Sequence, residues 1–294
     1  MKTASAIYKM LRVLDTSWYE IRVVQGNNIY GLDKLKSVTM HPMLTADSGI
    51  SIGNACSTEC KIMLLEQSEY WPRMAQFTVE FRICAGSGGT KSEWITAGTF
   101  YTDVRSEDKY GNLSIVAFDG MMKADQSWTD KIPSNDLPAT WPITAYAWAS
   151  MIQNAELATF DDLTQLDDSV AFIGLDTTTS IRDVLKSIAA VHAGNWTMTA
   201  NEKLKLIQFE NVTEPEQGQA ARYSNLERSM VTFEDSPSLS PVTGVHLETE
   251  AGTVVEAGTD AGYRIKSVCD FSDTTGVAEL CLSKISQYSY KPFT

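Results

Sequence analysis

Alternation of apolar and polar residues predicts β-strands through the first 120 residues. Residues 93–120 hold two such runs, joined by the polar loop 106–112, whose Ser, Asp, Gly and Asn are typical turn residues. We therefore expect a β-hairpin here. Apolar side chains fall on both faces of its second arm, residues 113–118, which is typical of a strand near the centre of a sheet or in a closed barrel.

Other strands are predicted before this hairpin. Residues 19–23 alternate and lead through a turn at 25–28 into a second short strand, and further strands are expected at 38–40 and 60–66. In residues 77–84 the alternation predicts a strand with one wet face, formed by Thr78, Glu80, Arg82 and Cys84. Six or seven short strands without a strong helix between them predict a small barrel or sandwich over residues 1–120.

Helical spacing appears after Gly120. Thr140 is expected to cap a helix that runs to about residue 157 and carries Ala145, Trp148, Ile152 and Ala155 on one face, which we interpret as a docking face. Ser180 and Asp183 have capping-box spacing, so a second helix should begin there and end at Gly194. A hairpin turning at 200–203 follows. Residues 121–220 are thus predicted to be an α/β insert domain.

Strand patterns return after residue 220. We expect strands at 230–233, 242–247, 253–256 and 263–268, followed by a helix with Val277, Leu280, Cys281 and Ile285 at helical spacing. So few strands would not make a domain that is stable on its own. We therefore predict that residues 221–294 are a second β-barrel, which a partner subunit or further residues complete. The predicted fold class is mainly β with an α+β insert.

The charge balance narrows the functional classes. The 294-residue chain carries a net charge of −13 and disperses its bases among its acids, which disfavours binding to a phosphate backbone. Hydrophobic residues make up 43% of the chain, yet no run approaches the roughly 18 apolar residues that span a bilayer. The first residues lack the pattern of a secretory signal. We therefore expect no membrane insertion and synthesis in the cytoplasm.

Candidate chemistry is sparse. The odd number of cysteines favours reduced, buried thiols; Cys56 and Cys60 have zinc-ligand spacing, but no second pair lies nearby, so a metal there is left open. His41, His192 and His246 are far apart and none lies in a nucleophile-elbow sequence. The acidic pairs 161–162 and 167–168 are interpreted as solvated side chains. We expect no catalytic, cofactor-binding or metal-binding residues, and no enzymatic activity.

Several stretches resemble the baseplate-hub and tail-tip proteins of tailed bacteriophages. Residues 50–64 are similar to that family's strand entry into its first barrel, and 93–104 to its strand around Gly98, Phe100 and Val104. The remaining similar stretches are 113–125, 179–198 and 288–293. Members of the family usually continue into a C-terminal spike, fibre or lytic region, and this sequence shows none.

The resemblance implies a structural virion protein at the tail tip. It implies a homotrimer whose barrels alternate around a ring, closing the tail tube and docking distal-tail, tail-tube, tape-measure and spike or fibre proteins. The acidic walls of such a hub would let DNA pass without sticking. No cofactor is implied.

Two other functions remain open. Short strands and aromatic residues also suit a carbohydrate- or host-receptor-binding β module, for which Trp71, Trp94 and Trp128 are the candidate sugar platforms. A cell-wall-degrading tail enzyme is the second alternative.

Overall fold

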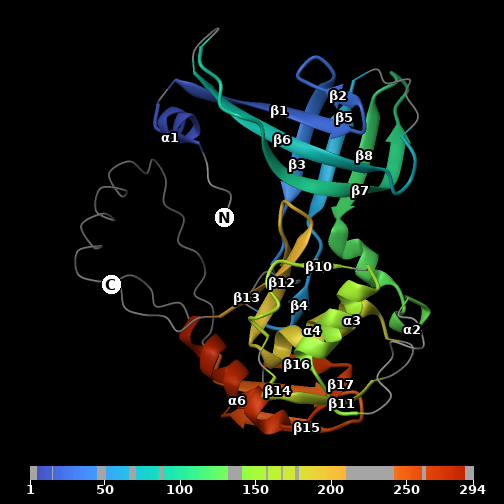
Figure 1. Ribbon diagram of the computed structural model, residues 1–294, viewed down its shortest axis with the longest axis vertical. Helices are drawn as coiled ribbons and strands as arrows, with labels where there is room; N and C mark the ends of the chain where they lie inside the picture. The colour runs from blue at the N-terminus through green and yellow to red at the C-terminus, as the bar shows by residue number, and fades with distance from the viewer. Residues whose placement is uncertain are drawn as a thin grey trace.

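The chain has two parts, arranged along its longest axis (Figure 1). The structure is a computed structural model. It describes residues 5–14, 16–44, 51–65, 71–85, 89–131, 141–156, 158–166, 168–175, 179–209, 242–259 and 263–288. Within these residues the fold is mainly β, with one curled seven-stranded sheet in the first part and three smaller sheets with helices in the second. In the described residues, no helix is both long enough and apolar enough to cross a membrane.

The curled sheet is antiparallel, and its spatial order is β2-β1-β6-β7-β8-β5-β3. Its strands are β1 (Ser17–Gln25), β2 (Asn28–Tyr30), β3 (Leu35–His41), β5 (Glu59–Leu64), β6 (Gln76–Ala85), β7 (Ile95–Glu107) and β8 (Leu113–Asp119). Both predicted hairpins, β1–β2 and β7–β8, are confirmed. The sheet is a half-barrel and not a closed barrel: in the described residues it ends at β2 on one side and at β3 on the other, and β3 pairs only with β5.

Aromatic side chains fill the concave face of this half-barrel. Trp71 packs edge-on against Phe77 at a centroid distance of 5.6 Å, and Phe77 stacks on Phe100 at 5.8 Å. The Trp71 indole donates a 2.6 Å hydrogen bond to the hydroxyl of Thr102, so its polar edge is satisfied inside the core. On β8 the predicted alternation is confirmed, since every second residue is buried.

The convex face of β1 and β6 carries paired charges. Arg22 lies opposite Glu80, and Glu20 lies opposite Arg82, each pair joined by a 2.6 Å hydrogen bond. The predicted wet face of β6 is wrong at Cys84, which is buried. The reason is that the chain folds back after the turn and forms a bridge from Lys91 to Cys84, which covers that end of the strand.

The second part has a single core that three small sheets and three main helices share. Its sheets have the orders β10-β13-β12-β4, β17-β11-β9 and β15-β14-β16. The strands are β4 (Asn54–Ala55), β9 (Ile143–Thr144), β10 (Thr159–Phe160), β11 (Ala171–Leu175), β12 (Gly194–Met198), β13 (Lys203–Gln208), β14 (Gly244–Thr249), β15 (Val254–Gly258), β16 (Tyr263–Ser267) and β17 (Cys269–Phe271). The helices are α2 (Trp128–Lys131), α3 (Ala145–Asn154), α4 (Ile181–Val191), α6 (Thr274–Ile285) and the short 3₁₀ turns η1 (Gly120–Asp125) and η2 (Ser286–Tyr288).

Helix α4 lies at the centre of this core and begins where the capping box predicted. The Ser180 hydroxyl accepts a 3.1 Å hydrogen bond from the backbone N–H of Asp183, and it donates to the Asp183 carboxylate at 2.7 Å. The predicted helix end is one residue off, since Ala193 and not Gly194 takes the positive φ, at 47°. The predicted hairpin after it, β12–β13, is confirmed.

Helix α3 corrects two predictions. It begins at Ala145 with Thr144 as its N-cap, whereas the predicted cap, Thr140, lies outside the described residues. The face that carries Trp148 does not form a surface: Trp148 has no exposed area and packs 4.9 Å from the ring of Phe172 in the core of its own chain. The aromatic stripe therefore marks core burial, and the docking interpretation of this helix is wrong.

The last described residues form a small sheet covered by α6. Strand β14 pairs antiparallel with β15 and parallel with β16, and Val277 and Cys281 of α6 are buried against the shared core. The strands predicted at 242–247, 253–256 and 263–268 and the helix after them are confirmed within a few residues. The strand predicted at 230–233 lies outside the described residues.

Candidate functional site

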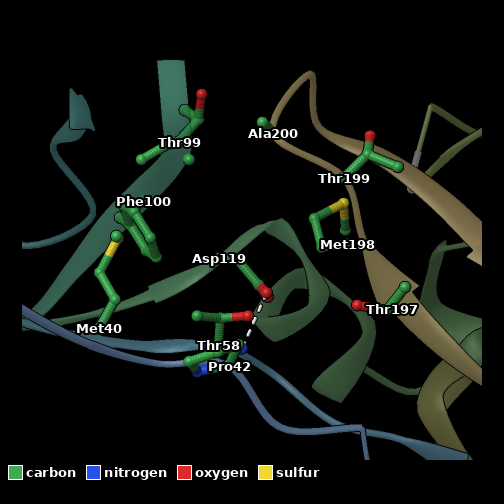
Figure 2. Close-up of a pocket in the computed structure, with 12 residues that line it drawn as sticks. Met40, Pro42, Thr58, Thr99, Phe100, Asp119, Thr197, Met198, Thr199 and Ala200 are labelled. Carbon is green, nitrogen blue, oxygen red and sulfur yellow. Dashed lines mark hydrogen bonds between the residues drawn. The ribbon is translucent and has the colours of Figure 1, made fainter. Parts of the chain in front are cut away.

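A cleft of about 370 Å³ lies where the half-barrel meets the β12–β13 hairpin, as Figure 2 shows. One wall comes from β7 and the end of β3, the other from the hairpin, and the end of β8 forms the floor. Its lining combines hydroxyls, one carboxylate, thioethers and an aromatic ring, from Met40, Thr58, Thr99, Phe100, Asp119, Thr197, Met198 and Thr199.

Among the described residues that line the cleft, Asp119 is the only one with an ionisable carboxylate or a basic group. One of its carboxylate oxygens accepts a 2.8 Å hydrogen bond from the backbone N–H of Thr58, and the other accepts a 3.1 Å bond from that of Met121. The residue therefore caps η1 and joins the end of β8 to the loop before β5. Burial raises the pKa of Asp119 above its ordinary value, while the hydrogen bonds from Thr58 and Met121 oppose that rise.

These hydrogen bonds give Asp119 a structural role. Both carboxylate oxygens accept hydrogen bonds from backbone N–H groups. The other polar side chains among the described lining residues are threonines. The arrangement in the cleft is suited to fixing the relative position of two parts of the chain.

A second polar cluster joins the two parts beside this cleft. The Tyr101 hydroxyl on β7 donates to the Glu202 carboxylate at the hairpin tip and accepts a 2.6 Å hydrogen bond from Lys123 of η1. Gln76 of β6 donates to the other Glu202 oxygen at 2.9 Å. Burial and the neighbouring Glu202 raise the pKa of Tyr101, so its hydroxyl stays protonated and remains a donor.

Arg182 at the start of α4 forms a third contact between segments far apart in the sequence. Its guanidinium donates to the Asp125 carboxylate, to the Ser57 hydroxyl at 3.0 Å and to the Met121 carbonyl at 3.1 Å. Strand β4 also crosses over from the first 120 residues and pairs parallel with β12. Glu202 therefore joins the two parts directly, whereas Asp119 and Arg182 hold the segments that connect them.

The tryptophans proposed as sugar platforms do not form a binding surface. Trp71 and Trp128 are buried in the two cores. Trp94 is partly exposed, but the guanidinium groups of Arg22 and Arg82 lie 4.1 and 4.3 Å from its ring centroid. Its ring is therefore engaged in cation–π contacts within the protein.

The structure keeps the three histidines apart. His41 is exposed at the end of β3, and His246 lies on β14 with its Nδ1 3.2 Å from Glu256. His192 is buried at the C-terminal end of α4, with its Nδ1 2.7 Å from the Ile188 carbonyl.

Four of the five cysteines are buried and none of the five forms a disulfide, which confirms the interpretation of most of them as reduced core thiols. Cys56, the exception, is partly exposed. Burial raises the pKa of the Cys60 thiol to about 12. Among the described residues, no group of three or more His, Cys, Asp and Glu side chains converges as metal ligands would.

The predicted solvated acids are partly described. Asp161 and Asp162 are exposed, and Asp162 accepts a 2.8 Å hydrogen bond from the Thr164 backbone. Asp168 accepts a 3.2 Å bond from the Tyr146 N–H at the start of α3, whereas Asp167 lies outside the described residues.

Sequence reasoning missed Asp119, Glu202 and Arg182. Asp119 carries a local signal, because an aspartate after a strand and before a turn of helix is a typical N-cap. Glu202 gives none: it occupies a turn, and its partner Tyr101 lies 101 residues away in sequence.

No family model matches the sequence, and no curated protein matches it. The similar solved structures include three tail proteins. They are a 43 kDa tail protein of prophage MuSo2 from Shewanella oneidensis (TM-score 0.43, 12% identity, covering 84% of this chain and 71% of that one), a tail protein from Neisseria meningitidis MC58 (0.48, 11%, 90% and 74%) and prophage tail protein gp18 from Listeria monocytogenes EGD-e (0.43, 10%, 85% and 72%). All three scores lie below 0.5, so these similarities establish neither a family nor a function for this chain.

Proposed function

We propose that this chain is a structural subunit of a phage tail, which forms a trimeric hub at the baseplate or tail tip. In this role the chain closes the tail tube, acts through its shape and charge, and catalyses no reaction. The proposed location is the tail tip of the virion, with synthesis in the cytoplasm of the bacterial host.

The observation that carries this proposal is the order of the parts. A curled seven-stranded sheet is followed by a capped helix and hairpin and then by a second β group with a helix, which is the order that the sequence resemblance to hub proteins implies. We propose the domain limits 1–120, 121–220 and 221–294, with the first and last as the two barrel-like units of a hub.

The charge supports the proposed place around a DNA channel. A net charge of −13 gives the surface an excess of acids, and a wall of that sign does not retain a polyanion that must slide past it. The proposed partners are two further copies of the chain, the distal-tail and tail-tube proteins, the tape-measure protein and spike or fibre proteins, with DNA only in passage.

Light scattering coupled to gel filtration tests the trimer. We expect a particle of three times the 32.4 kDa chain mass, and negative-stain micrographs of that peak should show rings with threefold or near-sixfold outline. A monodisperse monomer of the chain at all concentrations, with no rings in the micrographs, would contradict the hub.

A further inference from the structure

Two chain passages between the parts lie side by side. One leads from β4 to β5 through residues 56–58, and the other leads from β8 to η1 at residues 119–120, while the passage from β3 to β4 lies partly outside the described residues. The Thr58 N–H donates to the Asp119 carboxylate at 2.8 Å, and the Asp119 N–H donates to the Thr58 carbonyl at 3.1 Å. Both residues stand at the end of an element, which is where hinges between domains are found.

The tip of the β12–β13 hairpin is fixed to the half-barrel beside this pair. The Glu202 carboxylate accepts a 2.9 Å hydrogen bond from Gln76 and another from the Tyr101 hydroxyl. Gln76 and Tyr101 lie opposite each other on β6 and β7, so one carboxylate of the second part holds two strands of the first. We call these two hydrogen bonds the latch.

The apolar packing does not continue across the junction. The buried apolar residues of the described chain form two clusters, one in each part, with no shared member. Between the parts lie the cleft of about 370 Å³ and a second cavity of about 180 Å³ that Tyr101, Lys123 and Glu202 line. Relative motion is the expected behaviour of domains whose interface is small and polar. Breaking the latch would therefore leave both cores intact.

Strand β7 shows what such a motion would uncover. Phe100 belongs to the half-barrel core, so Thr99 and Tyr101 lie on the opposite, outer face of the strand. Both are nevertheless buried, with 7% and 8% of their surface exposed. Thr99 faces the cleft across from Met198 and Thr199 (Figure 2). The second part therefore covers the outer face of β7.

We propose that the two parts turn about the Thr58–Asp119 pair and that Glu202 is the residue that latches them. Release of the Glu202 carboxylate uncovers the outer face of β7. The latched form predominates, and the open form is a minor state in which both cores stay folded. The inference concerns a motion within one chain and does not depend on the trimer.

The test places a thiol on the covered face. Thr99→Cys supplies this reporter in a full chain that also carries Cys56→Ser, because Cys56 is the partly exposed native cysteine. N-ethylmaleimide labels a thiol when it becomes accessible, and peptide mass spectrometry gives the rate at each position. Cys60 and Cys269 have no exposed area, and they report unfolding of the half-barrel core and of the second core.

We expect Glu202→Ala to raise the labelling rate at position 99 about tenfold, because it removes two hydrogen bonds that only the latched form makes. In the same chain, position 99 should be labelled at least about tenfold faster than Cys60 and Cys269, since opening requires neither core to unfold. Gln76→Ala removes one of the two bonds and should raise the rate at position 99 about threefold.

Glu156→Ala is the matched control. Glu156 lines the same smaller cavity as Glu202, and its φ of 57° is close to the 58° of Glu202. Among the described residues, its carboxylate makes no hydrogen bond to the half-barrel. The control therefore removes a nearby negative charge at the same backbone conformation, and the rate at position 99 should stay within about twofold.

Three results would overturn the assignment. They are an unchanged rate at position 99 in both latch variants, an equal rise in Glu156→Ala, or equal rates at position 99 and at the two core cysteines in both latch variants. If Glu202→Ala does not fold, Gln76→Ala decides by the same criteria. Labelling does not depend on the particle mass, so a monomeric chain with latch-dependent labelling would contradict the proposed hub alone.

Discussion

Two buried tryptophans differ in whether the indole N–H has a hydrogen-bond acceptor. Trp148 and Trp196 both have no exposed area and both pack among aromatic rings. The Trp196 indole donates a 2.8 Å hydrogen bond to the Leu185 carbonyl of α4. The Trp148 indole N–H has no acceptor among the described residues, so it carries the desolvation cost of an unpaired donor.

This contrast predicts unequal costs for the same substitution. Trp196→Phe removes a hydrogen bond and Trp148→Phe removes an unpaired donor, while both lose similar ring volume. We expect the free energy of unfolding to fall by about 1–2 kcal/mol more in Trp196→Phe. Urea unfolding of both variants measures the difference. Equal losses would show that the Trp148 indole is satisfied in solution.

At the scale of elements, the sequence predicted those features that residues close together in the chain determine. The Ser180–Asp183 box, the turn after β1 and the alternation of β8 each lie within a few residues, and each gave the element that the structure has. Other features depend on residues far apart in sequence. These are the open edge of the half-barrel, the pairing of β4 with β12, and the hydrogen bond between Asp119 and Thr58. No periodicity reports such contacts. The stripe around Trp148 shows the limit, because spacing identifies an apolar face but not what covers it.

The cap of α4 gives a prediction with a defined pH dependence. Partial burial raises the pKa of the Asp183 carboxyl, but hydrogen bonds from Lys186 and Ser180 outweigh it and hold that pKa below its ordinary value. The stability that the ionised carboxylate contributes is therefore present above the unfolded pKa of about 4 and is lost as the pH falls through the lower folded value.

Ser180→Ala should therefore cost about 1 kcal/mol at pH 7 and less as the pH falls through the lowered pKa of Asp183. Thr144→Ala is the matched control, since Thr144 caps α3 through a 3.2 Å bond from the Ala147 N–H without a carboxylate partner. Its cost should not change over the same pH range. Thermal unfolding measures both, and parallel pH curves for the two variants would contradict the role of Asp183.

At the scale of the whole molecule, two separate cores have to keep one relative position. The half-barrel has its own apolar cluster, and the second part has another. Polar side chains join them: Tyr101 and Gln76 from the sheet hold Glu202 at the hairpin tip, where Glu202 adopts a positive φ of 58°. That backbone conformation is unfavourable for a residue with a side chain, so the contacts of the carboxylate must offset it.

Tyr101→Phe tests this joint, because it removes the hydroxyl and leaves the Glu202 carboxylate and Lys123 without their shared partner. We expect a loss of about 1.5–3 kcal/mol, the range for hydrogen bonds to charged groups, and faster amide exchange at residues 199–203. Tyr110→Phe is the control, since Tyr110 is 69% exposed at the loop between β7 and β8. Unchanged exchange at the hairpin tip in Tyr101→Phe would mean that the apolar contacts alone hold the two parts, and the polar cluster would then be a consequence of their packing.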